Sequence, residues 1–186
     1  ARLADVFVIN KEDSADPAEV ERLEASLKDL KPGAEIVHAD SPLSVDDPAL
    51  IRGKKVLCVE DGPTLTHGEM QFGAGVLAAK RFEAAEIVDP RPWVSGTIQA
   101  TFDAYPGIGS LLPAMGYSKD QIRDLEEVIN RVECDAVVIG TPIDLGRLVK
   151  INKPSVRVGY ALGDKGEPKL STLVERFLDA EADRKS

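Results

Sequence analysis

The chain has 186 residues, of which 43% are hydrophobic and 30% are charged, enough for one compact domain or two small ones. Lys and Arg total 23 against 32 Asp and Glu, a formal net charge of −9, which argues against nucleic-acid binding through a broad basic surface. Only 5% of the residues are aromatic, so the core must be aliphatic. No apolar run reaches the roughly 18 residues of a membrane-spanning helix, and the cytoplasm is the default localisation.

The first third of the chain predicts strands that alternate with a helix. A strand is expected at residues 6–9, followed by a helix that begins at Pro17, because Asp16 can cap it and proline suits the first helical position. Further strands are expected at 35–38 and 55–59. The polar segment 40–48 between them predicts a connection and a boundary between two subdomains.

The same alternation continues to the end of the chain. A loop is expected at 61–68, and Ser118 with Gln121 predicts a capped helix through a capping box. Further helices are expected at 70–82, 96–105, 143–151 and 170–180, and further strands at 85–88, 135–139 and 155–160. Cys58 and Cys134 lie in or beside apolar strands and are expected in the core.

This pattern predicts a three-layer α/β/α fold. Its strands are continuously apolar, which is typical of strands buried on both faces of a mostly parallel sheet with helices on each side. In such sheets ligands bind beyond the carboxyl ends of the strands. The residues just after each strand are therefore the candidates for function.

The first candidate is the sequence Asn10-Lys11-Glu12-Asp13, which follows the first strand. It matches the N-K-x-D pattern by which GTPases read guanine. A fixed carboxylate at Asp13 can accept from both N1–H and the exocyclic amine of guanine, whereas adenine would leave it unpaired in a desolvated pocket. Lys11 would cover the base and Asn10 would tie neighbouring loops together. The alternative is a polar turn before a helix.

The second candidate is the loop after the third strand. Backbone N–H groups near Gly68, together with Thr64, Thr66 and His67, predict an anion site at a helix N-terminus. His67 is also a candidate general acid or base. Asp61 and Glu69 are candidate magnesium ligands. The alternative is a capping loop with Thr66 as the cap.

The remaining candidates follow two later strands. Prolines on both sides of Arg91 stiffen its loop, and its guanidinium suits phosphate or carboxylate. The alternative is a rigid turn with a surface salt bridge. After the fifth strand, Thr141 and Asp144 precede basic residues that predict a site for an anionic ligand: Arg147, Lys150, Lys153 and Arg157. The alternative is that these cations complement the dipole of a helix C-terminus.

Long segments of the chain resemble the predicted GTPase family that includes cyclic 2,3-diphosphoglycerate synthetase. They are residues 59–70, 85–92, 112–117, 138–145 and 151–158. The resemblance implies a longer protein with a P-loop nucleotide-binding domain, of which this chain is the C-terminal portion. Residues 1–45 would be the last βαβ unit of that P-loop domain and 46–186 a C-terminal α/β domain, in one continuous sheet or two. The start at Ala1, without methionine, fits this expectation.

The resemblance implies a phosphoryl-transfer enzyme that uses ATP or GTP with Mg²⁺ to activate one phosphate of a small phosphorylated acid and so close an intramolecular phosphoanhydride. No G-x-x-x-x-G-K-[ST] sequence occurs in the chain, so these residues alone are expected not to hydrolyse a nucleotide by the P-loop route. Thr64, Thr66, His67 and Arg91 would contact phosphate, and Arg147, Lys153 and Arg157 would neutralise the acid.

Two alternatives stay open at this point. One is a GTP-binding regulatory module whose C-terminal domain binds a partner or a small anion without chemistry. The other is a metallochaperone-type P-loop protein, against which the lack of Cys and His clusters argues. The expected partners are a nucleotide and a phosphorylated acid, with no nucleic acid and no membrane, and a homo-oligomer is compatible with the sequence.

Overall fold

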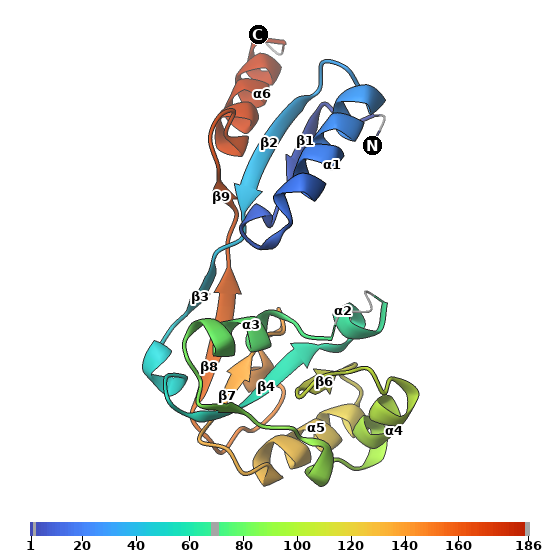
Figure 1. Ribbon diagram of the computed structural model, residues 1–186, viewed down its shortest axis with the longest axis vertical. Helices are drawn as coiled ribbons and strands as arrows, with labels where there is room; N and C mark the ends of the chain where they lie inside the picture. The colour runs from blue at the N-terminus through green and yellow to red at the C-terminus, as the bar shows by residue number, and fades with distance from the viewer. Residues whose placement is uncertain (2, 68–70, 185–186) are drawn as a thin grey trace. The chain divides into compact units, whose positions relative to one another are not determined.

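The computed structural model describes residues 1, 3–67 and 71–184. The chain forms two compact units (Figure 1). Unit 1 comprises Ala1–Pro42 together with Tyr160–Ser186, and unit 2 comprises Leu43–Gly159. The chain therefore enters unit 2 within the polar segment 40–48 and returns to unit 1 near Tyr160. The sequence-based division differs, because it assigned residues 160–186 to the second domain.

Unit 1 is a small sheet with two α-helices. Its strands lie in the order β1-β2-β9, with β1 parallel to β2 and β9 antiparallel to β2. Asp16 accepts a hydrogen bond from the Ala18 N–H and so caps the first α-helix, as predicted. The elements are β1 (Val6–Ile9), the 3-10 helix η1 (Glu12–Ser14), α1 (Pro17–Leu30), β2 (Glu35–Asp40), β9 (Gly163–Asp164) and α6 (Leu170–Arg184).

Unit 2 holds a larger sheet with strand order β3-β8-β7-β4-β5, and β6 also pairs with β4. The pairs β8–β7, β7–β4 and β4–β5 are parallel, and β6 is parallel to the end of β4. The first elements are β3 (Leu43–Val45), η2 (Pro48–Leu50), β4 (Lys55–Asp61), α2 (Gly62–His67), α3 (Ala74–Arg81), β5 (Glu86–Ile87) and η3 (Arg91–Trp93). They are followed by α4 (Gly96–Ala104), β6 (Leu112–Ala114), α5 (Lys119–Arg131), β7 (Ala136–Ile139), η4 (Leu145–Arg147) and β8 (Ser155–Tyr160).

The prediction of an α/β fold with parallel strands is confirmed. α3 lies on one side of β4 and β7, and α4 and α5 lie on the other (Figure 1). Because both faces are covered, residues 56–59 and 137–138 are fully buried, which explains why these strands are apolar throughout. Cys58 lies in this core, where burial raises the pKa of its thiol. The single continuous sheet allowed by the sequence is not formed, since the units have separate sheets.

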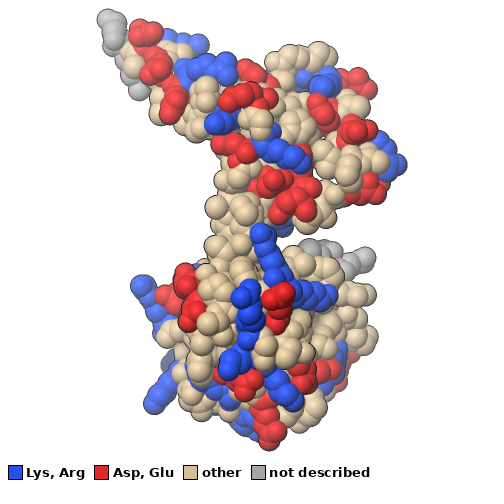
Figure 2. Space-filling view, turned by 60° about the vertical axis from the view of Figure 1, so that its left-hand side comes forward, with Lys and Arg blue, Asp and Glu red and all other residues tan. Residues whose placement is uncertain are grey.

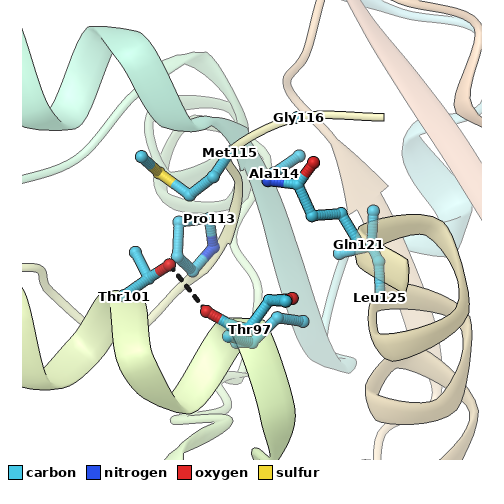
Figure 3. A pocket seen from close by; sticks show the side chains of 9 residues that line it. Thr97, Thr101, Pro113, Ala114, Met115, Gly116, Gln121 and Leu125 are labelled. Carbon is cyan, nitrogen blue, oxygen red and sulfur yellow. Dashed lines mark hydrogen bonds between the residues drawn. The ribbon is translucent and has the colours of Figure 1, made fainter. Parts of the chain in front are cut away.

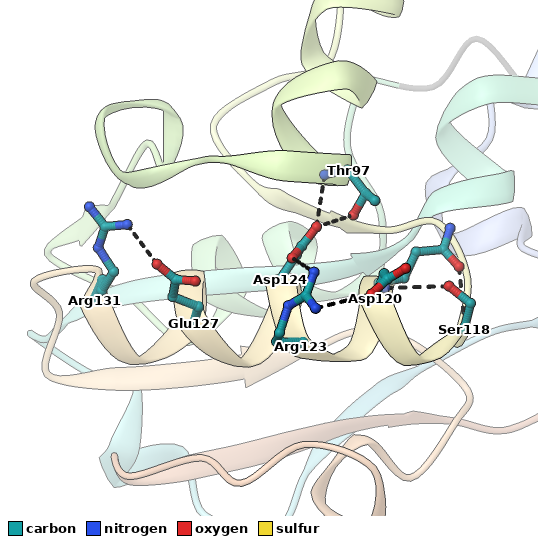
Figure 4. Close-up of polar contacts among 8 residues, drawn as sticks. Thr97, Ser118, Asp120, Arg123, Asp124, Glu127 and Arg131 are labelled. Carbon is teal, nitrogen blue, oxygen red and sulfur yellow. Dashed lines mark hydrogen bonds and ion pairs between the residues drawn. The ribbon is translucent and has the colours of Figure 1, made fainter.

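The α4–α5 pair is joined by polar contacts (Figure 4). Ser118 and Gln121 form the predicted capping box at the start of α5. Asp124, one turn further along, accepts hydrogen bonds from the backbone N–H and the hydroxyl of Thr97, at 2.8 and 2.9 Å. These bonds satisfy the N-terminus of α4 and hold the pKa of Asp124 below its usual value. Gly96 precedes Thr97 with φ +57°, and a Cβ there would lie 2.4 Å from the Asp124 carboxylate.

Two local predictions are wrong, and two short strands were not predicted. No α-helix forms at 143–151, where the structure has only η4; Gly146 lies in the middle of this short segment and disfavours a helix. The predicted loop at 61–68 instead forms α2 over Gly62–His67, because Pro63 is favourable in a first helical turn. The strands β3 and β6 were not predicted; each is three residues long, and Pro113 within β6 is atypical of a strand.

None of the helices within the described ranges is both long enough and apolar enough to cross a bilayer. On the face seen in Figure 2, basic and acidic side chains are interspersed over each unit. This pattern agrees with the net charge of −9, because an acidic chain has few cations with which to build an extended basic surface.

Candidate functional site

The candidate site is the carboxyl-terminal edge of the sheet in unit 2. The chain leaves β4 through α3 and forms β5 on one side, whereas α5 leads to β7 on the other side of β4. The strand order thus reverses at the β4–β7 pair, and ligands of open α/β sheets bind beyond the carboxyl ends of strands at such a reversal. The loops after β4 and β7 begin at this point.

A buried carboxylate occupies the reversal point. Glu60, near the end of β4, is only 1% exposed. It accepts a hydrogen bond of 2.8 Å from the Val76 N–H in the first turn of α3, and the nearby N–H groups of Gly73 and Gly75 also favour its charged form. Burial outweighs these donors and raises the pKa of Glu60. The protein's own carboxylate therefore fills the helix N-terminus that would otherwise attract an external anion.

Glycines make room for this carboxylate. A Cβ at Gly73 or Gly140 would lie 2.4 Å from Glu60 Oε2, and one at Gly75 would lie 3.1 Å from Oε1. Gly140, the first residue after β7, also donates a hydrogen bond to the Val59 carbonyl of β4. Glu60 was not among the predicted site residues, although an acidic residue at the end of an apolar strand and glycines in two following loops are visible in the sequence.

The loop after β7 brings together several predicted site residues. Thr141 is buried, with only 2% of its surface exposed, and its hydroxyl lies 3.3 Å from the Tyr117 hydroxyl. Arg157, on the neighbouring β8, donates a hydrogen bond of 3.1 Å to the Pro142 carbonyl. Arg147 forms an ion pair of 3.0 Å with Asp144 while its side chain stays 85% exposed. Thr141, Asp144, Arg147 and Arg157 thus border one loop.

Lys153 does not join this group. It precedes β8, at the amino end of that strand. Its ammonium donates hydrogen bonds to the carbonyls of Ile129 and Asn130 at the end of α5, at 3.1 and 2.7 Å. A cation here complements the negative end of the helix dipole, which is the alternative that the sequence left open for the basic residues.

Arg91 is engaged by partners on several elements. Its guanidinium pairs with Asp89 at 2.7 Å and donates a hydrogen bond to the Ile108 carbonyl. It also lies 4.7 Å from the centroid of the Phe102 ring, within the range of a cation–π interaction. Arg91 therefore fixes the loop after α4 against η3, and a phosphate would have to compete with these contacts.

The loop after β4 contains the other predicted phosphate contacts. α2 begins directly after Asp61, and a Cβ at Gly62 would lie 2.7 Å from the Met115 Cα, so this helix starts against the end of β6. Thr64, Thr66 and His67 belong to α2. The predicted phosphate contact at Gly68 and the predicted magnesium ligand Glu69 lie outside the described residues. Within the described ranges, no group of three or more acidic, His or Cys side chains is arranged to hold a metal.

The predicted base-reading residues lie in unit 1, after β1. Asn10 accepts a hydrogen bond from the Lys11 N–H, and Lys11 adopts a left-handed conformation with φ 65°. Asp13 is exposed and accepts a bond of 3.1 Å from the Ser41 N–H. One oxygen of Asp13 is thus bonded to a backbone N–H, and among the described residues none buries this carboxylate.

A polar cluster adjoins these residues in unit 1. The Glu12 side chain is 7% exposed and lies 2.5 Å from Nδ1 of His38 on β2. The Lys165 ammonium lies 3.3 Å from the other Glu12 oxygen and 4.0 Å from Asp40. This Glu12–His38–Lys165 cluster, which no sequence motif predicts, connects η1 to β2 and to the segment after β9.

A small cavity lies among α4, α5 and the end of β6 (Figure 3). Its volume of about 20 Å³ is sufficient for a single water molecule. The Thr101 hydroxyl at its wall donates to the Thr97 carbonyl, 2.9 Å away. The cavity is therefore too small for a nucleotide or for a phosphorylated acid.

The fold places unit 2 in the class of open parallel α/β sheets, whose sites lie at the carboxyl ends of the strands. No family model matches the chain. The chain is 52% identical over 176 residues to a protein named arginine synthetase ArcE from Thermococcus kodakarensis, and the match covers 95% of the chain. The match spans 39% of the length of that relative.

Proposed function

We propose that the chain forms part of a synthetase that couples cleavage of a nucleotide phosphoanhydride to bond formation. The similarity to arginine synthetase carries this proposal, because 52% identity extends over 95% of the chain and thus includes both units. The proposed activity belongs to a longer enzyme of which this chain is one part, since the match spans 39% of the length of the relative. In that enzyme this chain would be the C-terminal portion beside a P-loop-type nucleotide domain.

The edge of unit 2 supports a role in phosphoryl transfer. Phosphoryl transfer depends mainly on positioning and on neutralising developing negative charge. Arg157 and Arg147 lie around the loop after β7 with Thr141 and Asp144, and their guanidinium groups suit phosphate oxygens. In the proposed site, Thr64, Thr66 and Gly68 contact phosphate, His67 and Arg91 act in catalysis, and Asp61 and Glu69 hold Mg²⁺.

The proposed nucleotide is ATP or GTP, and unit 1 contains the candidate base contacts Asn10, Lys11 and Asp13. Two similarities suggest which compound is activated by the nucleotide. The name of the relative favours a reaction that forms arginine or a chemically related compound. The resemblance of the long segments to cyclic 2,3-diphosphoglycerate synthetase favours a phosphorylated acid. In either reaction, the arginines near the β7 loop would neutralise phosphate.

The test is a co-substrate requirement. The complete protein that carries this chain is incubated with Mg²⁺ and ATP or GTP, together with either ammonium and amino-acid precursors or 2,3-diphosphoglycerate. Nucleotide consumption and arginine formation are measured. Arginine formation supports the first acceptor, and consumption that requires the diphosphoglycerate supports the second. Turnover that ignores every co-substrate contradicts a synthetase and favours a regulatory GTP-binding module.

A matched pair of variants tests the site itself. Arg157→Gln removes a cation beside the β7 loop, and we expect turnover to fall by at least about tenfold because transition-state charge is less well neutralised. Arg131→Gln removes a cation of the same type from a surface ion pair on α5 and should leave turnover unchanged. Equal activity of the two variants would exclude a role for Arg157.

A further inference from the structure

A second, larger pocket lies in unit 2, and its described lining contains none of the residues assigned to the proposed synthetase site. Its volume is about 310 Å³, which lies at the lower end of the range of about 300–1,000 Å³ for small-molecule sites. It is bounded by the segment before α3, by α3 itself, by β5 and by the segment between α4 and β6. Val76 and Ile87 provide apolar walls, and Phe72 adds an aromatic ring that is 39% exposed.

Among the described residues that line this pocket, Lys80 is the only charged one. Its ammonium lies 5.2 Å from the centroid of the Phe72 ring, which holds the cation at the pocket by a cation–π interaction. Among the described residues, no carboxylate forms an ion pair with Lys80, and the side chains of Ser110 and Gln71 make no hydrogen bond. The described part of the lining thus combines one cation without an ion-pair partner, unused hydrogen-bonding groups and apolar walls.

The walls are held in place from both sides. The Gly109 N–H donates a hydrogen bond of 3.2 Å to the Gln71 carbonyl, and a Cβ at Gly109 would lie 2.6 Å from that oxygen. On the other side, the bond from Val76 to the buried Glu60 carboxylate fixes the start of α3. A pocket whose walls are already fixed loses little conformational entropy when a ligand binds.

We propose that this pocket binds a small carboxylic acid with an apolar or planar body. The ligand carboxylate pairs with Lys80 and accepts a hydrogen bond from Ser110, while its body packs on Val76, Ile87 and the free part of the Phe72 ring. A carboxylate fits better than a phosphate, because a single lysine neutralises one negative charge and would leave part of a phosphate dianion uncompensated.

The test is a titration of the 186-residue chain with 4-methylpentanoate, 4-methylpentanamide and inorganic phosphate, followed by heteronuclear NMR shifts of amides around the pocket. For so small a ligand we expect a dissociation constant of about 1–10 mM. Binding of the acid with at least tenfold weaker binding of the amide and of phosphate would support the proposal. Equal binding of acid and amide, tighter binding of phosphate, or no shifts with the acid would overturn it.

Three variants test which side chains contribute to binding of the acid. Lys80→Gln should weaken 4-methylpentanoate binding at least tenfold, and Ser110→Ala should weaken it by a smaller factor. Lys119→Gln removes a lysine from the first position of α5, away from the pocket lining, and should bind as the unchanged chain does. Both Lys80 and Lys119 are exposed, so neither change is expected to disturb folding. Unchanged binding by Lys80→Gln would refute the assigned role of this lysine.

Discussion

The two units of the molecule differ in what holds them together. The large hydrophobic core lies entirely in unit 2. Among the described residues of unit 1, the buried hydrophobic side chains are Ile9, Val37, Ala39 and Leu173. Several large apolar side chains of unit 1 remain exposed instead: Leu23, Val174, Phe177 and Leu178.

This difference indicates where the stability of the chain lies. Burial of apolar surface contributes roughly 25 cal/mol per Å², so unit 2 gains far more from its core than unit 1 does. Unit 1 depends more on the Glu12–His38–Lys165 cluster, whose net contribution is reduced by the cost of removing charges from water. We therefore expect unit 1 to unfold before unit 2.

The largest expected effect comes from core truncation. Ile129→Ala removes a fully buried side chain of α5, and such a change costs about 2–5 kcal/mol. Trp93 is the only tryptophan and lies in unit 2, so its fluorescence reports that unit alone, whereas circular dichroism reports both. In urea, Ile129→Ala should lower the midpoint of the Trp93 transition.

The matched variant in unit 1 is Ile9→Ala, at a β1 residue that is 4% exposed. It should shift only the part of the circular dichroism transition that precedes the Trp93 transition. A shift of the Trp93 midpoint of the same size in both variants would show that the units unfold together. It would contradict the expectation that unit 1 unfolds before unit 2.

The next effect concerns the close packing around Glu60. Gly140→Ala places a Cβ 2.4 Å from both Glu60 Oε2 and the Gly75 nitrogen, and overpacking of this kind costs about 1–3 kcal/mol. Gly146→Ala is the control, since its Cβ would meet only Asp144 Oδ1 at 3.6 Å. Urea unfolding followed by Trp93 should show a lower midpoint for the first variant alone. Equal midpoints would mean that the β4–β7 edge is not tightly packed.

A smaller, pH-dependent effect is expected at Asp124. In the folded state the pKa of Asp124 lies below its usual value of 3.8, mainly because the Thr97 N–H bonds the carboxylate. The charged carboxylate therefore stabilises the folded state at pH values above 3.8. This stabilisation is lost as the pH falls through the lowered pKa of the folded state. Asp124→Asn should cost about 1–2 kcal/mol at neutral pH. The difference from the unchanged chain should disappear at acidic pH, as measured by urea unfolding.

Asp120→Asn is the control for this prediction. Asp120 is an exposed residue on the same helix, and Arg123 is its ion-pair partner among the described residues. Its replacement should change stability little at any pH. A stability loss for Asp124→Asn that is the same at neutral and acidic pH would show that packing, and not the charge on Asp124, joins the two helices.

The smallest expected effect lies in unit 1. Glu12→Gln removes the charge shared with His38 and Lys165, and loss of such a bond costs about 1 kcal/mol. Hydrogen exchange of the β1 and β2 amides should become faster while that of β4 and β7 stays unchanged. Glu19→Gln, in an exposed pair with Arg22 on α1, should change neither. Faster exchange in β4 would contradict the independence of the units.

Much of the fold was predictable because it depends on local patterns. Continuous apolar runs identified β1, β4 and β7, and the Ser118–Gln121 capping box marked the start of α5. β6 was not predictable in this way, since it exists only because residues 112–114 pair with the end of β4. The return of residues 160–186 to unit 1 likewise depends on the pairing of Gly163 and Asp164 with β2.

The candidate site was predictable only in outline. Rules for parallel sheets placed Thr141 and Asp144 at the carboxyl edge of the unit 2 sheet, where they lie in the structure, and β8 brought Arg157 beside them. Lys153 was grouped with them because it is near in sequence, whereas the start of β8 separates them in space. Glu60 was missed because its significance comes from the backbone of α3, which a linear pattern does not show.

The pairing of the connecting strands has a consequence for the modular construction of the chain. β3 opens unit 2 and β8 closes it, and the two are neighbours in one sheet. In unit 1, Asp40 of β2 pairs with Gly163 of β9. These two residues lie close in sequence to Pro42 and Tyr160, where the chain leaves unit 1 and returns to it. Unit 2 therefore behaves as an insertion with adjacent ends. A short linker from Pro42 to Tyr160 could close unit 1 without it, and residues 43–159 could be transplanted as a cassette.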